Sequence, residues 1–219
     1  MQENEKGCVG MPMLKRTIWM IIAVFMVAGN SMAVEEAKYS VIIKDDEYEL
    51  RKYEPHILAE TIVDTSFEDA GNEAFNRLFK YISGNNKRKQ EVAMTAPVGQ
   101  ALSSQEVQMT SPVSQERQDG KWAVSFMMPG SFTLETTPEP MDSSVKIRRV
   151  PARYVAAISY SGFWSEKNYS LNLEKLWSWI QERAYRPVGE PVWARYNPPF
   201  MPWFLRRNEI LVPVEIHEQ

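Results

Sequence analysis

The sequence of 219 residues predicts an α+β fold built from two similar halves. Two segments, 66–83 and 167–185, carry apolar residues at helical spacing, whereas much of the remaining chain alternates apolar and polar residues as strands do. The halves also align with each other, because ELRKYEPHILAET (49–61) matches the pattern of KIRRVPARYVAAI (146–158). One half cannot bury its sheet face alone. We therefore expect one sheet system that curls about a shared core, with the two helices related by pseudo-symmetry.

The first helix is expected over 66–83, because the signals for both of its ends are present. Ser66 is a favourable N-cap residue with Asp69 three positions later, and Gly84 follows the last turn. The apolar side of this helix carries Ala74, Phe75, Leu78, Phe79 and Ile82.

The second helix is expected over 167–185 and is halted before Pro187. Its apolar positions are Leu173, Leu176, Trp177, Ile180 and Ala184. Strands are expected at 48–53, 57–63, 121–128, 145–150, 154–159, 192–196 and 209–214.

Each half reads as a strand-strand-helix-strand unit, and the two copies lie about 100 residues apart. LFKYI (78–82) aligns with LWSWI (176–180), and Thr95-Ala96-Pro97 aligns with Tyr196-Asn197-Pro198. A proline at a strand end costs no ladder hydrogen bond. The two prolines therefore mark where a strand leaves the sheet beside the mouth of the barrel.

The first 33 residues have the pattern of a secretory signal peptide. Lys15 and Arg16 precede the uncharged run IWMIIAVFMVA (18–28), and a small-x-small cleavage site ends at Ala33. We expect the protein to be exported to the periplasm as one domain, 34–219, with no membrane span after cleavage. An uncleaved signal anchor is the alternative.

Composition argues against a nucleic-acid-binding protein and against a protein stabilised by disulfides. The chain carries 25 basic and 28 acidic side chains, and this slight negative charge gives no electrostatic footprint for nucleic acid. Cys8, the single cysteine, precedes the apolar run, so the exported part has no disulfide framework and depends on a packed core.

Five phrases of the sequence, in this order, resemble the SOUL haem-binding protein family from about Tyr39 to Val214. The phrases are YELRKYEP (48–55), LFKYISGNN with VAMTAPV (78–98), VSFMMP (124–129), YSGFW (160–164) and ARYNPPFMPWFLRRNEI (194–210). The resemblance implies a distorted antiparallel β-barrel flanked by two helices. It also implies reversible binding of a tetrapyrrole, without a known reaction.

A haem site requires an apolar slot, and we expect the first helix and the tail loop to form one. The candidate residues are Phe75, Leu78, Phe79, Ile82, Met94, Tyr196, Phe200 and Met201. For Leu78 and Ile82 the alternative is an ordinary place in the core. The loop YNPPFMPWF (196–204) is more apolar than a solvated connection needs, which suggests a lid or a docking surface for a protein partner.

The haem propionates require cations, and the iron can take an axial ligand. Arg206, beside the aromatic loop, is the best propionate candidate. Lys52 holds the place at which some family members have a histidine that is a proposed ligand, but its deprotonation at pH 7 costs about 4 to 5 kcal/mol. His56, with an ordinary pKa of about 6.5, is the better ligand. The alternative for His56 is a hydrogen-bonded strand residue.

Two other functions compete with haem binding. An enzyme is disfavoured because the exported part has no cysteine, no G-x-S-x-G motif and one internal histidine. The second is an exported module that binds another apolar or cationic small molecule, or a protein partner. The absence of a C-x-x-C-H motif excludes covalent attachment of haem.

Overall fold

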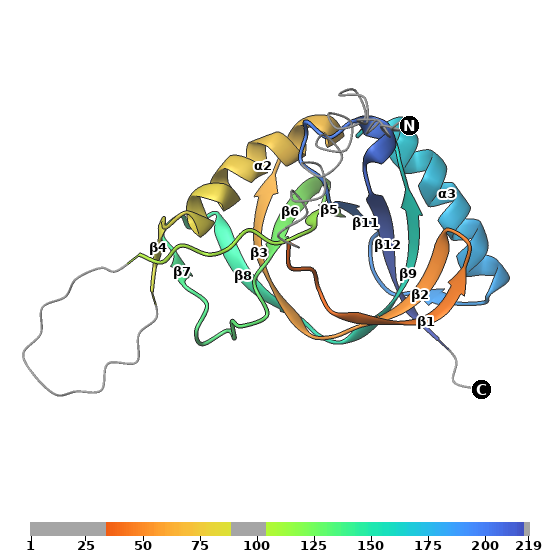
Figure 1. Cartoon of the computed structure of the whole chain (residues 1–219), viewed down its shortest axis with the longest axis horizontal. Coiled ribbons are helices and arrows are strands. Elements are labelled where there is room, and N and C mark those ends of the chain that lie inside the picture. Colours follow the sequence, from red (N-terminus) through yellow and green to blue (C-terminus); the bar gives the residue numbers. More distant parts are fainter. Residues whose placement is uncertain (1–33, 89–103, 217–219) are drawn as a thin grey trace, which may run out of the picture. The chain divides into compact units, whose positions relative to one another are not determined.

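One strongly curved antiparallel sheet carries two helices on its outer face (Figure 1). The computed structural model describes residues 34–88 and 104–216. The helices are α2 (Phe67–Ile82) and α3 (Glu166–Glu182), and η1 (Trp203–Leu205) is a 3-10 turn. The long strands are β1 (Tyr39–Asp45), β2 (Tyr48–Tyr53), β3 (His56–Val63), β5 (Val113–Gln118), β6 (Lys121–Met127), β8 (Val145–Val150), β9 (Arg153–Tyr160), β11 (Val192–Arg195) and β12 (Asn208–Glu215). Three short strands are β4 (Asn86–Lys87), β7 (Glu139–Pro140) and β10 (Arg186–Pro187).

The two halves of the sheet have equivalent strand orders. From the edge at β1, the strands after β1 follow in the order β2-β9-β12-β11. From the opposite edge, they follow in the equivalent order β8-β3-β6-β5. Leu50 of β2 pairs with Ala156 of β9, and Ile147 of β8 pairs with Ala59 of β3. The two pairs are equivalent, because Ile147 lies 97 residues after Leu50 and Ala156 lies 97 residues after Ala59. The α+β class with two flanking helices is confirmed. The barrel is an open one, because β1 and β8 are the two ends of the sheet.

The helix α2 packs on the half of the sheet that contains β3 and β6. The Ser66 side chain accepts a hydrogen bond from the Asp69 N–H at 3.2 Å, as the sequence predicts for an N-cap. Leu78 and Ile82 are buried in the same cluster as Val124 of β6. Full burial of one such side chain contributes about 1.5–3 kcal/mol, which explains why this helix lies against the sheet.

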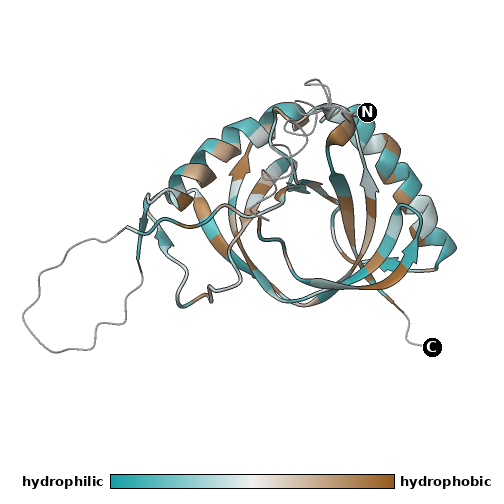
Figure 2. Ribbon diagram, in the orientation of Figure 1, coloured by the Kyte–Doolittle hydropathy of each residue, from teal (hydrophilic) through white to brown (hydrophobic). Residues whose placement is uncertain are grey.

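The helix α3 covers the other half in the same way, with Leu176 and Ile180 buried against Ile210 of β12. This helix ends at Glu182, three residues before the predicted end. Ala184 adopts a positive φ of 54°, and hydrogen bonds from the N–H groups of residues 184 and 185 to the carbonyls of 181 and 180 close a Schellman cap. Figure 2 shows apolar and polar positions alternating along both helices and along the strands.

The remaining predicted strands are present with boundaries shifted by at most one or two residues. The strands β1 and β5 were not predicted. Each half continues beyond its helix with two paired strands, β5–β6 and β11–β12, where the sequence alignment indicated one. The expected signal peptide and Met94 lie outside the described residues. No helix in the described ranges is long and apolar enough to cross a bilayer.

Candidate functional site

The inner face of the sheet carries polar and charged side chains among apolar ones, whereas the face under the helices is apolar. Successive side chains of a strand point to opposite faces. On β12, Ile210 and Val212 belong to the core beneath α3, whereas Glu209, Leu211 and Pro213 face the inner hollow or its wall. The hollow is therefore lined by groups that can bind a ligand.

A buried carboxylate organises one wall of this inner face. Glu209 accepts hydrogen bonds from Arg51 (2.7 and 3.0 Å), Ser159 (3.0 Å), Tyr196 (2.7 Å) and Arg207 (3.1 Å). Burial opposes the ionisation of Glu209, but the hydrogen bonds and positive charges of the two arginines outweigh burial and hold its pKa below the ordinary value. This cluster fixes the start of the tail loop to β2.

The opposite wall carries a second charged group. Arg148 donates to Glu60 at 2.6 Å and to Glu116 at 3.0 Å. Burial raises the pKa of Glu116, although the charge of Arg148 opposes this rise. Burial also lowers the pKa of Arg153. Arg153 holds the first position of β9, as His56 holds the first position of β3 97 residues earlier.

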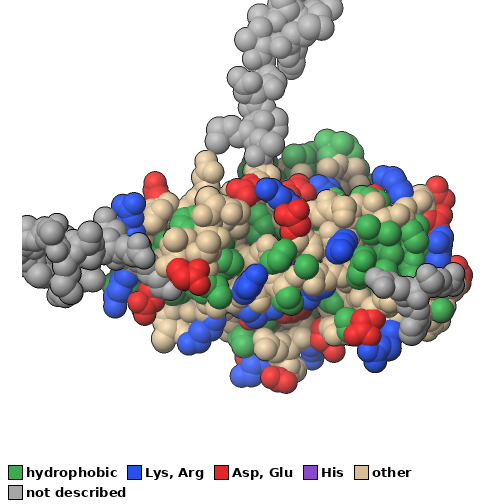
Figure 3. All heavy atoms as spheres, turned by 90° about the horizontal axis from the view of Figure 1, so that it is seen from below, with side chains coloured by type: hydrophobic (Ala, Val, Ile, Leu, Met, Phe, Trp, Pro, Cys, Tyr) green, Lys and Arg blue, Asp and Glu red, His purple; other side chains and the backbone are tan. Residues whose placement is uncertain are grey.

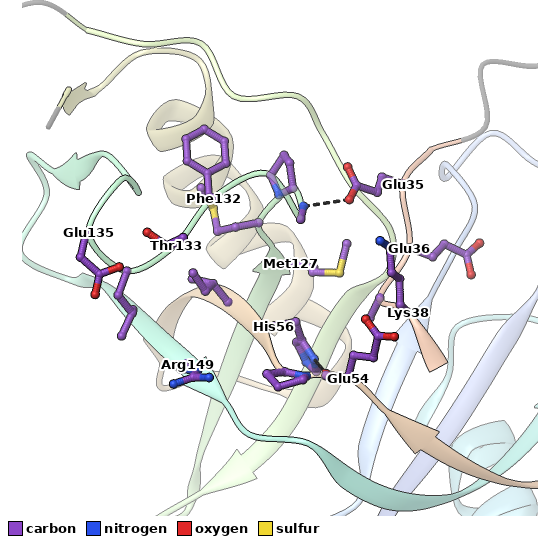
Figure 4. A pocket seen from close by; sticks show the side chains of 17 residues that line it. Glu35, Glu36, Lys38, Glu54, His56, Met127, Phe132, Thr133, Glu135 and Arg149 are labelled. Atoms are coloured by element: carbon purple, nitrogen blue, oxygen red, sulfur yellow. Dashed lines mark hydrogen bonds between the residues drawn. The ribbon is translucent and has the colours of Figure 1, made fainter. Parts of the chain in front are cut away.

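Two hollows adjoin where β3 starts and β6 ends, and four residues line both of them: Glu36, Ala37, His56 and Met127. The larger hollow has a volume of about 390 Å³ and lies between the segment before β1, the start of β3 and the loop after β6. The smaller one, of about 60 Å³, lies deeper against the two charged walls. Figure 4 shows His56 and Met127 in the middle of the larger hollow, with Phe132 on one side and Glu36 on the other.

The imidazole of His56 is fixed in one tautomer. Its Nδ1 lies 3.0 Å from the carbonyl oxygen of Glu54, and because a carbonyl can only accept, Nδ1 carries the proton. The other nitrogen, Nε2, has no hydrogen-bond partner within residues 34–88 and 104–216. Burial, with smaller contributions from Arg153 and Arg148, lowers the pKa of His56 below its ordinary value of 6.5. At neutral pH the ring is therefore neutral, with a free lone pair on Nε2.

The rim of the larger hollow carries both apolar and charged groups. Ile57, Met127, Met128, Phe132 and Leu134 contribute apolar side chains. Lys38 and Arg149 contribute positive charges, and neither forms an ion pair with another described residue. Four carboxylates, Glu35, Glu36, Glu54 and Glu135, lie on the same rim. On the face seen in Figure 3, acidic and basic side chains are interspersed.

Most residues predicted for the slot lie away from these hollows. Of the predicted set, His56 lines both hollows and Tyr196 lines the smaller one. Leu78 and Ile82 are core residues beneath α2, in agreement with the alternative stated for them. Phe75 and Phe79 stack on each other at 5.7 Å on the helix side of the sheet.

The predicted cations and the tail loop lie elsewhere as well. Lys52 alternates with Arg51 along β2 and lies 5.6 Å from the ring of Tyr154, on the face opposite to His56. Arg206 donates to the carbonyls of Met201 and Pro199 within its own loop.

Sequence analysis did not identify Met127, Phe132 and Arg149 as neighbours of His56. Met127 belongs to the phrase VSFMMP, which was noted only for the family resemblance. The order β8-β3-β6 brings Arg149 and Met127 beside His56, and no local pattern encodes that order.

The family model described as "SOUL heme-binding protein" matches residues 34–213. The chain belongs to this family. Heme-binding protein 1 of Mus musculus is 29% identical over 154 residues, which are 68% of this chain and 74% of that protein. Heme-binding protein 2 of Homo sapiens is 27% identical over 172 residues, covering 74% and 79% of the two chains. The family predicted from the five sequence phrases is thereby confirmed.

The comparison with solved structures gives the fold. The C-terminal domain of EcmrR superposes with a TM-score of 0.54 at 10% identity, over 81% of this chain and 98% of that one. At this identity the similarity concerns the architecture of sheet and helices alone.

Within the described part of the chain, no group of three or more His, Cys, Asp or Glu side chains could hold a metal ion.

Proposed function

We propose that this protein binds haem, or a related tetrapyrrole, reversibly in the larger hollow, with Nε2 of His56 as the ligand of the iron. The geometry of His56 is the observation that carries this proposal. Its Nδ1 proton is held by the Glu54 carbonyl, and its Nε2 lone pair is unused among the described residues. A hydrogen bond from the other ring nitrogen to a backbone carbonyl is the arrangement that orients ligating histidines in metal sites.

The donor set of the hollow fits a tetrapyrrole better than a bare metal ion. One imidazole is too few ligands for a protein-only metal site, but a porphyrin supplies four further nitrogens of its own. The flat ring requires apolar contacts, which Ile57, Met127 and Phe132 can provide. A volume of about 390 Å³ lies within the range of small-molecule sites, roughly 300–1,000 Å³.

The two cations on the rim, Lys38 and Arg149, are the proposed partners of the propionates. Their side chains line the hollow from the segment before β1 and from β8. Haem would supply the iron and its redox chemistry when bound. The residues of the chain would hold the ring, fix the imidazole and exclude water, so we propose a binding function without catalysis. We also propose export, on the strength of the sequence pattern in residues 1–33.

The test is a haem titration followed by absorption spectroscopy. The unmodified protein should shift the Soret band of haem and give the signature of histidine ligation. His56→Ala should remove that signature, and His217→Ala, the same change at the other histidine of the chain, should not. An identical spectrum for His56→Ala and the unmodified protein would rule out ligation by His56.

The carboxylates on the rim support a second candidate, an apolar organic cation. Glu54 on the rim could pair with the positive charge of such a ligand, whereas Glu36 is already paired with Arg207. Binding of rhodamine 6G, an aromatic cation, can be measured by fluorescence anisotropy. If this candidate is right, Glu54→Gln weakens dye binding and His56→Ala does not. If haem is the ligand, the dye does not compete with it.

A further inference from the structure

A surface of exposed aromatic and aliphatic side chains lies outside the proposed haem site. It is formed by Phe163 (58% exposed), Phe200 (84%), Trp203 (48%), Phe204 (58%) and Leu205 (61%), and we call it the aromatic surface. Phe163 stacks on Trp203 at 5.3 Å, and Trp203 meets Phe204 edge to face at 5.5 Å. The loop before α3 and the turn η1 therefore form one continuous surface.

The aromatic surface is held in a defined shape. The guanidinium of Arg206 donates to the carbonyls of Met201 (2.8 Å) and Pro199 (2.7 Å), and the Gly162 N–H donates to the Trp203 carbonyl at 3.1 Å. Prolines at 198, 199 and 202 further restrict the backbone. Little entropy would be lost when such a preformed surface binds.

Its side chains and the charges beneath it favour a lipid surface. The ten residues 196–205 contain no charged side chain. Behind them, the guanidinium of Arg206 lies 4.3 Å from the centre of the Trp164 ring, and it forms no ion pair with a described carboxylate. Tryptophan and phenylalanine are favourable at the boundary of headgroups and acyl chains, and nearby arginines favour anionic lipids.

We propose that the aromatic surface docks on an anionic lipid bilayer, with its apolar side chains at the level of the headgroups and Arg206 beside the phosphates. A protein partner is the other occupant that such a surface could take. A surface that binds only a protein partner would not respond to vesicles of pure lipid. This proposal is independent of haem binding.

A fluorescent label at one position separates docking of this surface from any attachment through the N-terminal segment. In a full chain with Cys8→Ser, the change Leu205→Cys allows an environment-sensitive nitrobenzoxadiazole label on the aromatic surface. The matched control is Gln181→Cys, an exposed position in the last turn of α3, at the other end of that helix.

Vesicles of phosphatidylglycerol should shift the emission of the label at 205 to the blue with a several-fold increase in intensity. The label at 181 should change little, and vesicles of phosphatidylcholine should have a weaker effect on the label at 205. Adding Phe200→Ser and Phe204→Ser should abolish the response. A silent label at 205, or equal responses at 205 and 181, would overturn the proposal. Circular dichroism and haem titration of the same variants confirm that they are folded.

Discussion

The buried carboxylate of Glu209 permits a quantitative prediction, because removing its charge takes away the buried counter-ion that Arg51 and Arg207 share. Its side chain is 1% exposed, and that of Arg51 is 3% exposed. Glu209→Gln preserves shape and one oxygen but replaces the other oxygen with an NH₂ group that faces guanidinium donors. Breaking a buried ion pair on one side costs about 3–5 kcal/mol. For a domain of this size, about 2–4 °C is lost per kcal/mol, so the melting temperature should fall by roughly 10 °C.

Urea unfolding and calorimetry measure this loss. The control is Glu215→Gln, whose side chain is 58% exposed and pairs with Arg186 at the surface, and it should cost less than about 1 kcal/mol. Because the pKa of Glu209 is lowered in the folded state, its stabilisation is complete above the ordinary value of 4.5 and is lost as the pH falls through the folded pKa. The difference between Glu209→Gln and the unmodified protein should therefore shrink in acid. Equal losses for the two variants at pH 7 would refute this account of the cluster.

Three further results are expected. Haem affinity should be constant around neutral pH and should fall only at a pH below the ordinary histidine pKa of 6.5, because burial lowers the pKa of His56 and a proton competes with iron for its Nε2 only in acid; an unchanged affinity in acid would argue against nitrogen ligation. Gly71→Ala should destabilise the protein although alanine favours helices by about 1 kcal/mol, because the new Cβ would lie 2.1 Å from the guanidinium of Arg195; a gain in urea midpoint would show that this side chain moves freely. Asn86→Ala should cost about 1–3 kcal/mol in urea unfolding, because the buried amide exchanges three hydrogen bonds with Gln105 and the Tyr81 carbonyl, and Asn86→Asp should not restore it.

Much of the fold could be predicted because its periodicities are local. The apolar positions of α2 and α3 recur at helical spacing, and Ser66, the N-cap of α2, is recognisable in the sequence. The strand β5 was missed because VSQERQ is polar, although Gln115 is buried and donates to the Phe67 carbonyl at 3.0 Å. The strand β1 was missed because a bulge between Val41 and Ile43 breaks its alternation. In both strands, backbone pairing with neighbours outweighs the side-chain pattern.

The site was harder to predict than the fold, because it depends on the order of strands. Chemistry alone singled out His56 as the better ligand, and its position in both hollows is compatible with that reasoning. The apolar residues of α2 were assigned to the same slot, but the helix side and the inner side of a sheet are separate environments. Phe200 is exposed in the structure, and a sequence cannot distinguish an apolar side chain in a loop that lines a pocket from one that faces solvent.

The matched positions of His56 and Arg153 have a consequence for recognition. An assembly of two identical half-chains would carry the same side chain at both places, and its central cavity would look alike from either direction. Because one polypeptide contains both halves, one place holds a group that exchanges its proton near neutrality and the other holds a group that stays charged. The inner face is therefore asymmetric in charge, and its two halves do not present the same surface to a ligand.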